Sequence, residues 1–148
     1  MSKFIFPYGI RFQEDGRIEV FPAAELFVLG RNGRGLHAVF HIDSGATTSI
    51  MPASDADALG INTKTGKKFI VRGITGEPLV GYRHTASVQF DNHRIKIPVI
   101  FIEHIAVPRI IGREDIFIRF GILFDEAKRR TVFVNISKGR RSIDSLCA

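Results

Sequence analysis

Hydrophobic and polar residues alternate along most of this chain, so that about every second side chain is apolar. A period of two residues is typical of β-strands that turn one face to a core, and the many Phe, Val, Ile and Thr residues favour strands as well. The pattern predicts short strands at residues 17–21, 26–28, 36–42, 69–71, 79–82, 85–90, 95–101, 110–112, 122–124 and 131–134. Many short strands at regular spacing indicate a mainly β domain.

Turn signals join several of these strands into hairpins. Asn32-Gly33 lies between two strand-like runs, which is a strong signal for a hairpin turn. Residues 73–81 predict a long hairpin with a glycine-rich tip, and residues 122–134 predict a last hairpin. The run over 36–42 is largely apolar, so we expect it to be a buried strand.

Two segments carry helix signals instead. Residues 52–59 predict a short helix in which Ser54 and Asp57 form a capping box and Gly60 follows the last turn. Residues 114–120 predict a second helix of about two turns. The predicted domain therefore combines many strands with one or two short helices.

Length and composition fit a single globular domain. The chain has 148 residues, of which 45% are hydrophobic and 24% are charged, and these shares are close to the average of folded proteins. We expect residues 1–16 to be an N-terminal extension, residues 17–137 to be the domain, and residues 138–148 to be a basic tail that frays.

The sequence also excludes several classes of protein. Its apolar runs are far shorter than the roughly 20 residues that a membrane-spanning helix needs, and its N-terminus does not resemble a secretory signal. With a single cysteine, Cys147, no intrachain disulfide can form. We therefore expect a cytoplasmic protein without a membrane partner.

The net charge of +6 is concentrated in one segment. Residues 128–141 contain six Lys and Arg residues and no acid, which equals the whole excess of positive charge. Such a segment could contact nucleic acid or an anionic membrane. Aromatic residues do not alternate with these bases to form a stacking platform, so a solvated turn and tail is the favoured interpretation, and we do not expect nucleic acid as a partner.

The most informative segment is Asp43-Ser44-Gly45-Ala46, which directly follows the strand at 36–42. A carboxylate at the end of a buried strand is costly, so a catalytic role is favoured over a structural turn for Asp43. His37 and His41 would share its strand face, but no third residue has the spacing of a metal ligand. We therefore predict no metal site.

Residues 40–46 resemble the active-site loop of the retropepsin-like aspartic peptidases, in which an apolar strand is followed by Asp-Thr/Ser-Gly-Ala. Residues 110–116 resemble the second signature of that family, two apolar residues followed by Gly, Arg and Asn or Asp. The hairpin at 73–81 stands where the family has its flap, and the hairpin at 121–134 is similar to the bacterial, non-viral members. The resemblance covers residues 17–136 and implies a closed β-barrel of the acid-protease type.

This resemblance implies an aspartic endopeptidase that hydrolyses extended polypeptides without a cofactor. In aspartic peptidases a water lies between two carboxylates, one ionised and one protonated, because two like charges about 3 Å apart cannot both be ionised. The chain has one Asp-Ser-Gly loop, so the resemblance implies a homodimer with C2 symmetry in which each copy supplies Asp43. Activity should favour mildly acidic pH.

The resemblance also implies roles for the residues around Asp43. Ser44 would bond to its counterpart across the two-fold axis, Gly45 would let the substrate backbone approach, and Ala46 would keep the pocket open. The tip of the flap would close over an extended peptide as an added strand. The residues of this tip are Gly73, Ile74, Thr75 and Gly76.

The second signature would line and support the same site. Ile110 and Ile111 would form apolar pocket walls, while Gly112 and Arg113 would support the catalytic loop. Many viral members carry an acid four positions after the catalytic Asp, and it pairs with the arginine of the second signature. This chain has Thr47 there, which leaves the partner of Arg113 open, and Glu114 is a second departure from the family's pattern.

Two other functions remain as alternatives. The same dimer could be a catalytically silent binding or scaffolding module, because a fold does not determine a function. A small basic β-barrel could instead bind nucleic acid through residues 128–141, and steep salt dependence of binding would support that function. Dependence of cleavage on Asp43 would support the peptidase.

Overall fold

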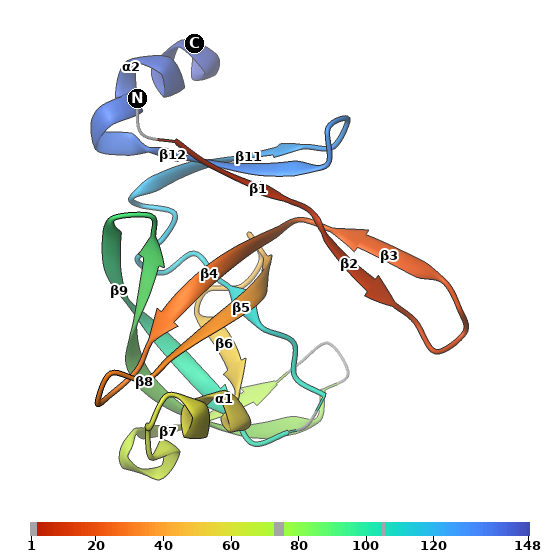
Figure 1. Ribbon diagram of the computed structural model, residues 1–148, viewed down its shortest axis with the longest axis vertical. Coiled ribbons are helices and arrows are strands. Elements are labelled where there is room, and N and C mark those ends of the chain that lie inside the picture. Colours follow the sequence, from red (N-terminus) through yellow and green to blue (C-terminus); the bar gives the residue numbers. More distant parts are fainter. Residues whose placement is uncertain (1–2, 73–75, 105) are drawn as a thin grey trace.

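The computed structural model describes residues 3–72, 76–104 and 106–148, and Figure 1 shows its ribbon. Within these residues the chain is mainly β, with two α-helices and a short 3₁₀ helix. The strands are β1 (Lys3–Pro7), β2 (Gly9–Phe12), β3 (Ile18–Phe21), β4 (Ala23–Leu29), β5 (Gly35–Ile42), β6 (Ser49–Pro52), β7 (Lys67–Arg72), β8 (Pro78–Phe90), β9 (His93–Ile102), β10 (Ile110–Ile111), β11 (Phe120–Asp125) and β12 (Arg130–Asn135). The helices are α1 (Ala53–Ala58), η1 (Thr63–Thr65) and α2 (Ile136–Cys147).

Seven strands form the central sheet, in the order β4-β5-β10-β6-β9-β8-β7. β4 also pairs with β8, so the sheet returns on itself and six of its strands close into a ring. The 13-residue strand β8 makes this closure possible, because its residues 81–90 pair with β9 while residues 78–83 also pair with β7 and residues 87–89 with β4. The alternating apolar side chains of these strands form one hydrophobic core, which includes Leu26, Phe40, Met51, Val88 and Phe101.

A second sheet, in the order β1-β12-β11, packs on one end of the ring, and α2 follows its middle strand (Figure 1). Aromatic rings join the two sheets. Phe90 of β8 has its ring centroid 5.6 Å from Phe4, 4.9 Å from Phe120 and 5.5 Å from Phe133, and such tilted contacts stabilise beyond the area they bury. Phe4 is therefore a core residue within the predicted N-terminal extension.

β2 and β3 form a separate two-stranded hairpin that extends away from both sheets (Figure 1). Its register pairs Ile10 with Val20 and Phe12 with Ile18. We call residues 9–21 the arm.

The predicted hairpins are present in the residues that the structure describes. β4 and β5 are antiparallel around Asn32 and Gly33, whose φ angles of 55° and 72° match the turn that this dipeptide favours. β11 and β12 form the predicted last hairpin. The strand predicted to be buried is β5, but only alternate residues of it are buried, because its other face, with His37 and Val39, is exposed.

The first predicted helix is present, but its predicted cap is wrong. α1 begins after Pro52, and no side chain caps it, so Ser54 and Asp57 do not form a capping box. Gly60 does follow the helix with φ 69°, the left-handed conformation that glycine adopts without strain.

The second predicted helix is wrong. Residues 113–119 form a series of turns, because Asp115 has φ 62° and the amide of Glu114 donates to the carbonyl oxygen of Thr47, which lies far away in the sequence. Ile116 still reaches the core from these turns, as does Phe120 at the start of β11.

The frayed tail is also wrong, since residues 136–147 form α2. Asn135 caps this helix by accepting a hydrogen bond from the amide of Ser137 at 3.0 Å. Ile143 packs over Gly121 of β11, so the sheet below stabilises a helix that the polar sequence alone does not predict.

Candidate active site

The position of Asp43 is set by three neighbouring strands. β5 ends at Ile42, and β6 begins after the loop at 43–48. β10 lies between them, parallel to β5 with Ile110 beside His41, and antiparallel to β6 with Ile110 beside Ile50. The amide of Asp43 donates to the carbonyl oxygen of Ile111 at 3.1 Å, so the second motif holds the first directly.

The loop orients the Asp43 carboxylate through its own backbone. The amide of Gly45 donates to Asp43 Oδ1 at 2.8 Å, and the amide of Ala46 donates to the carbonyl oxygen of Asp43 at 3.3 Å. A Cβ on Gly45 would lie 3.2 Å from Asp43 Oδ1. Asp43 is half-buried while Ser44 and Gly45 are exposed, so the loop presents an oriented carboxylate at the surface.

The second motif is joined to this loop along its whole length. The amide of Arg113 donates to the carbonyl oxygen of Ala46 at 2.9 Å, and that of Glu114 donates to Thr47 at 2.8 Å. The amide of Gly112 donates to the buried Ser49 Oγ at 3.1 Å. A Cβ on Gly112 would lie 2.7 Å from the carbonyl carbon of Thr48, so no larger residue fits between the two segments.

Glu114 forms an ion pair that the sequence did not predict. Its carboxylate accepts from Arg83 Nη2 at 2.6 Å, from Arg83 Nη1 at 3.1 Å and from Thr48 Oγ1 at 2.9 Å. The hydrogen bonds from Arg83, followed by the one from Thr48, hold the pKa of Glu114 below its ordinary value, against the opposing effect of burial. The pKa of Arg83 is raised by the same hydrogen bonds. In the sequence, Glu114 stands out as the acid directly after Arg113. Its ion-pair partner, Arg83, lies 31 residues away, so a local pattern does not identify it.

Arg113 is partnered by the residue that replaces the viral acid. Its Nη2 donates to Thr47 Oγ1 at 3.4 Å, and both residues are exposed. Thr47 therefore stands where many viral members have an acid. Its hydroxyl makes a longer and weaker contact with Arg113 than an ion pair would.

A second ion pair fixes the segment that precedes β10. Arg109 donates from Nε and Nη2 to the two carboxylate oxygens of Asp55 at 2.7 and 2.8 Å, and Asp55 is only 5% exposed. The carbonyl oxygen of Arg109 accepts from the amide of His41 at 2.9 Å. α1 and β5 thus hold Ile110 and Ile111 beside the Asp43 loop, and neither Asp55 nor Arg109 was predicted from the sequence.

The remaining predicted residues differ in how accessible they are. Ile110 is half-buried beside His41, whereas Ile111 is fully buried in the core, so only Ile110 is open to a ligand in the single chain. Gly76 is exposed with φ 78°. Gly73, Ile74 and Thr75 lie outside the described residues.

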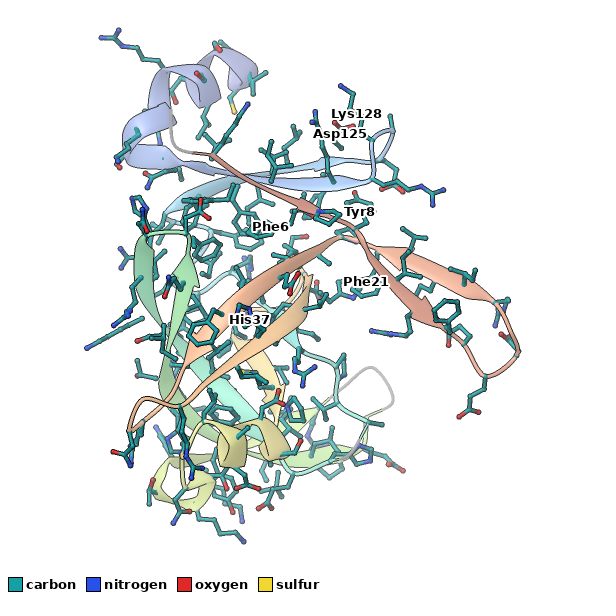
Figure 2. All side chains as sticks on the ribbon, viewed as in Figure 1. Phe6, Tyr8, Phe21, His37, Asp125 and Lys128 are labelled. Carbon is teal, nitrogen blue, oxygen red and sulfur yellow. The ribbon has the colours of Figure 1, made fainter. Side chains whose placement is uncertain are left out.

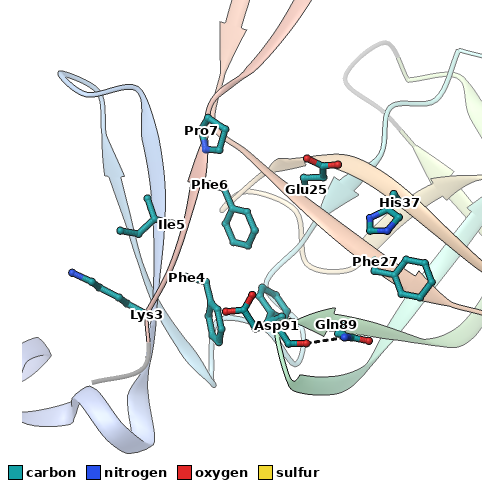
Figure 3. A pocket seen from close by; sticks show the side chains of 11 residues that line it. Lys3, Phe4, Ile5, Phe6, Pro7, Glu25, Phe27, His37, Gln89 and Asp91 are labelled. Carbon is teal, nitrogen blue, oxygen red and sulfur yellow. Dashed lines mark hydrogen bonds between the residues drawn. The ribbon is translucent and has the colours of Figure 1, made fainter.

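Two pockets lined by described residues lie beside β5. A pocket of about 480 Å³ lies between β1 and β4 and is shown in Figure 3. Another, of about 350 Å³, lies beside β5 and includes Phe21, His41 and Arg109.

Two features of the described residues bear on other functions. No group of three His, Cys, Asp or Glu side chains among them could hold a metal ion. No helix in residues 3–72, 76–104 or 106–148 is long and apolar enough to cross a membrane.

Comparisons with known proteins agree on the fold. A family model described as "gag-polyprotein putative aspartyl protease" matches residues 31–114, more than half of the chain, and the chain therefore belongs to this family. A retropepsin-like aspartic protease from Rickettsia conorii is similar in structure, with a TM-score of 0.55 and 19% identity over 89% of this chain and 90% of that chain. The EIAV protease complexed with the inhibitor HBY-793 has a TM-score of 0.45 and 19% identity over 63% of this chain and 82% of that chain. No curated protein matches the sequence.

The fold is thus retropepsin-like, which confirms the resemblance seen in the two motifs. The matched residues include both the Asp43 loop and the segment at 110–114, which lie together in the structure.

Proposed function

We propose that this protein is an aspartic endopeptidase that works as a homodimer, with one Asp43 from each copy at a shared site. The observation that carries this proposal is the Asp43 carboxylate itself. It stands at the end of β5, is oriented by the amide of Gly45, and is half-buried at the surface on a loop bonded to residues 111–114. The ring of strands is, on this proposal, the closed barrel of the acid proteases.

The chemistry needs two such carboxylates. With one ionised and one protonated, the ionised carboxylate takes a proton from a water molecule that attacks the peptide carbonyl carbon. The protonated carboxylate donates a hydrogen bond to the carbonyl oxygen, where negative charge develops. The pair titrates as a single system that holds one proton, so catalysis requires a pH at which that proton is present.

The neighbouring residues then have specific roles. The exposed Ser44 hydroxyl would bond across the two-fold axis, and the exposed Gly45 leaves room for a substrate backbone. Ile110 would contact an apolar substrate side chain, and residues 73–76 would close over the peptide. The substrate is an extended polypeptide, because an added strand pairs through main-chain groups that every sequence offers.

The test is cleavage of an unfolded protein between about pH 4 and 7, the range in which such a shared proton is lost. Wild type is compared with Asp43→Asn, which keeps the size of the side chain but cannot supply the shared charge. Asp57→Asn is the matched control, because Asp57 is exposed on α1 and away from the Asp43 loop.

We expect Asp43→Asn to lower the rate at least about 100-fold, as loss of general acid–base catalysis does, and Asp57→Asn to leave it unchanged. Equal cleavage by wild type and Asp43→Asn would contradict the proposal and indicate a contaminant or another residue. A wild-type dimer that cleaves nothing would favour a binding or scaffolding module instead.

A further inference from the structure

The arm has one apolar face that no other part of the described chain covers. Cross-strand pairing places Ile10 opposite Val20 and Phe12 opposite Ile18, so these four side chains share one face of the hairpin. Ile10 is 63% exposed, Phe12 is 77% exposed and Ile18 is 61% exposed. A contiguous apolar patch of this kind on a projecting element is typical of an interaction site.

On the opposite face of the arm, polar side chains form hydrogen bonds with one another. Glu19 accepts from Arg11 at 3.5 Å and from Gln13 at 2.9 Å. Near the turn, Arg17 donates to Asp15 at 2.6 Å. A two-stranded hairpin is marginally stable by itself in water. The arm should therefore be stabilised by a surface that covers its exposed apolar face.

The root of the arm is firmly held, so the arm projects in a fixed direction. Tyr8 is buried, its amide donates to the carbonyl oxygen of Arg129 at 2.9 Å, and its hydroxyl donates to Glu126 Oε2 at 2.9 Å. At the other strand, the ring of Phe21 stacks on His41 with centroids 5.0 Å apart. Figure 2 shows Tyr8 and Phe21 at this root. A preorganised surface loses little conformational entropy when it binds.

This root lies next to the catalytic loop. The carbonyl oxygen of Pro22, the residue after β3, accepts from the amide of Ile42, which directly precedes Asp43. From its root to its turn the arm is about six residues long, or roughly 20 Å at about 3.4 Å per residue. A second copy that brings its own Asp43 to this one therefore lies close to the root of the arm.

Charge favours a second copy of the same chain as the occupant. The arm contains two arginines and three acids, which gives it a net charge of −1 and leaves +7 on the rest of the chain. A weakly acidic arm can approach the strongly basic body of a second copy without like-charge repulsion.

We infer that the arm packs its apolar face onto a second copy of this chain, and that this contact holds together the dimer in which two Asp43 residues meet. The inference rests on the proposed function, because the Asp43 site is incomplete without a second copy. Each arm reaches from the root beside its own Asp43 onto the partner, so the interface is continuous with the site.

The test is the dimer dissociation constant from sedimentation equilibrium, measured for wild type, Phe12→Ser and Leu146→Ser. Leu146 is the matched control, because it is 82% exposed but lies on α2. We expect Phe12→Ser to raise the dissociation constant at least about tenfold and Leu146→Ser to leave it unchanged. Ile10→Ser should act in the same direction. Since Phe12 is largely exposed in one chain, the variants should keep the wild-type circular dichroism spectrum.

Two outcomes would overturn the inference: a wild type that stays monomeric at micromolar concentration, or a Phe12→Ser variant that dimerises as tightly as Leu146→Ser. The proposed peptidase function fails independently of these results. If wild type cleaves in an Asp43-dependent way while Phe12→Ser dimerises normally, the proposed peptidase function is supported and the inference that the arm binds a second copy is contradicted. If Phe12→Ser weakens the dimer but wild type does not cleave, the inference about the arm is supported and the proposed peptidase function is contradicted.

Activity provides a second readout of the arm. If it acts only through association, the specific activity of Phe12→Ser should recover as the enzyme concentration rises, whereas that of Asp43→Asn should stay low at every concentration.

Discussion

The Asp43 loop and the segment at 110–114 lie side by side, yet they differ in how they are built. The loop is exposed at Ser44 and Gly45, and the Asp43 side chain bonds within the loop, to the amide of Gly45. The other segment contains the buried residues Ile111 and Gly112, and it is tied to distant parts of the chain through Glu114. The rigidity of the loop therefore comes from its neighbour more than from its own contacts.

The difference separates residues that would act on a substrate from residues that keep the loop in place. A substitution at Asp43, Ser44 or Gly45 should change activity more than stability, because Ser44 and Gly45 are exposed and the Asp43 carboxylate bonds within the loop. A substitution in the segment at 110–114 should change stability first and activity as a consequence. Three predictions test this contrast, from the largest expected effect to the smallest.

Gly112→Ala should lower the free energy of unfolding by about 2 kcal/mol, or the melting temperature by roughly 4–8 °C. The added Cβ would lie 2.7 Å from the carbonyl carbon of Thr48 and 2.8 Å from its oxygen, and these backbone atoms cannot move without shifting the loop. Gly45→Ala is the matched comparison, because its Cβ would lie 3.2 Å from a single side-chain oxygen, Asp43 Oδ1. Thermal unfolding at one protein concentration measures both, and equal losses of stability in the two variants would break the contrast.

Glu114→Gln should lower the free energy of unfolding by about 1 kcal/mol near neutral pH, because it weakens the half-exposed pair with Arg83. In wild type the pKa of folded Glu114 lies below its ordinary value of 4.5. The pair's contribution is thus fully present above pH 4.5 and is lost as the pH falls through the lower folded pKa.

Urea unfolding from neutral to acidic pH checks the sign of this effect. The stability difference between wild type and Glu114→Gln should shrink only below pH 4.5, so the support would remain charged at the mildly acidic pH that the peptidase needs. A difference that instead grows as the pH falls would show that this pair is not the cause.

Thr47→Asp should have the smallest effect, a gain of less than about 1 kcal/mol, because both Thr47 and Arg113 are exposed. A carboxylate there would accept from Arg113 Nη2, which lies 3.4 Å from the present hydroxyl. The gain should fall as salt is added, and Thr47→Asn should not reproduce it. Melting curves at low and high salt measure it, and a clear loss of stability would mean that Arg113 serves another role.

Local signals predicted those parts of the fold that depend on neighbours in the sequence. The alternation of apolar residues predicted most of the strands, though not β1, β2 or β6, and Asn32-Gly33 predicted the β4–β5 turn, since each signal depends on a few consecutive residues. The signals over 114–120 failed because the amide of Glu114 bonds to Thr47 and its carboxylate to Arg83. These long-range contacts cannot be read from consecutive residues, and they outweigh the local preference of residues 114–120 for a helix.

The candidate site divides in the same way. Its two motifs could be identified from the sequence, because short runs of fixed residue types mark them, and the match over residues 31–114 contains both. The Arg83–Glu114 and Arg109–Asp55 pairs could not, because nothing in the sequence specifies which of many arginines and acids will meet.

By itself, then, the sequence determined a mainly β chain, the turns of its hairpins, and one Asp-Ser-Gly loop that would need a second copy. Only the tertiary structure decided that the ring closes through β4 and β8, that the polar C-terminal segment is a helix packed on Gly121, and that the arm leaves its apolar face bare. Period and turn chemistry act over a few residues, whereas closure, packing and exposure depend on which distant surfaces meet.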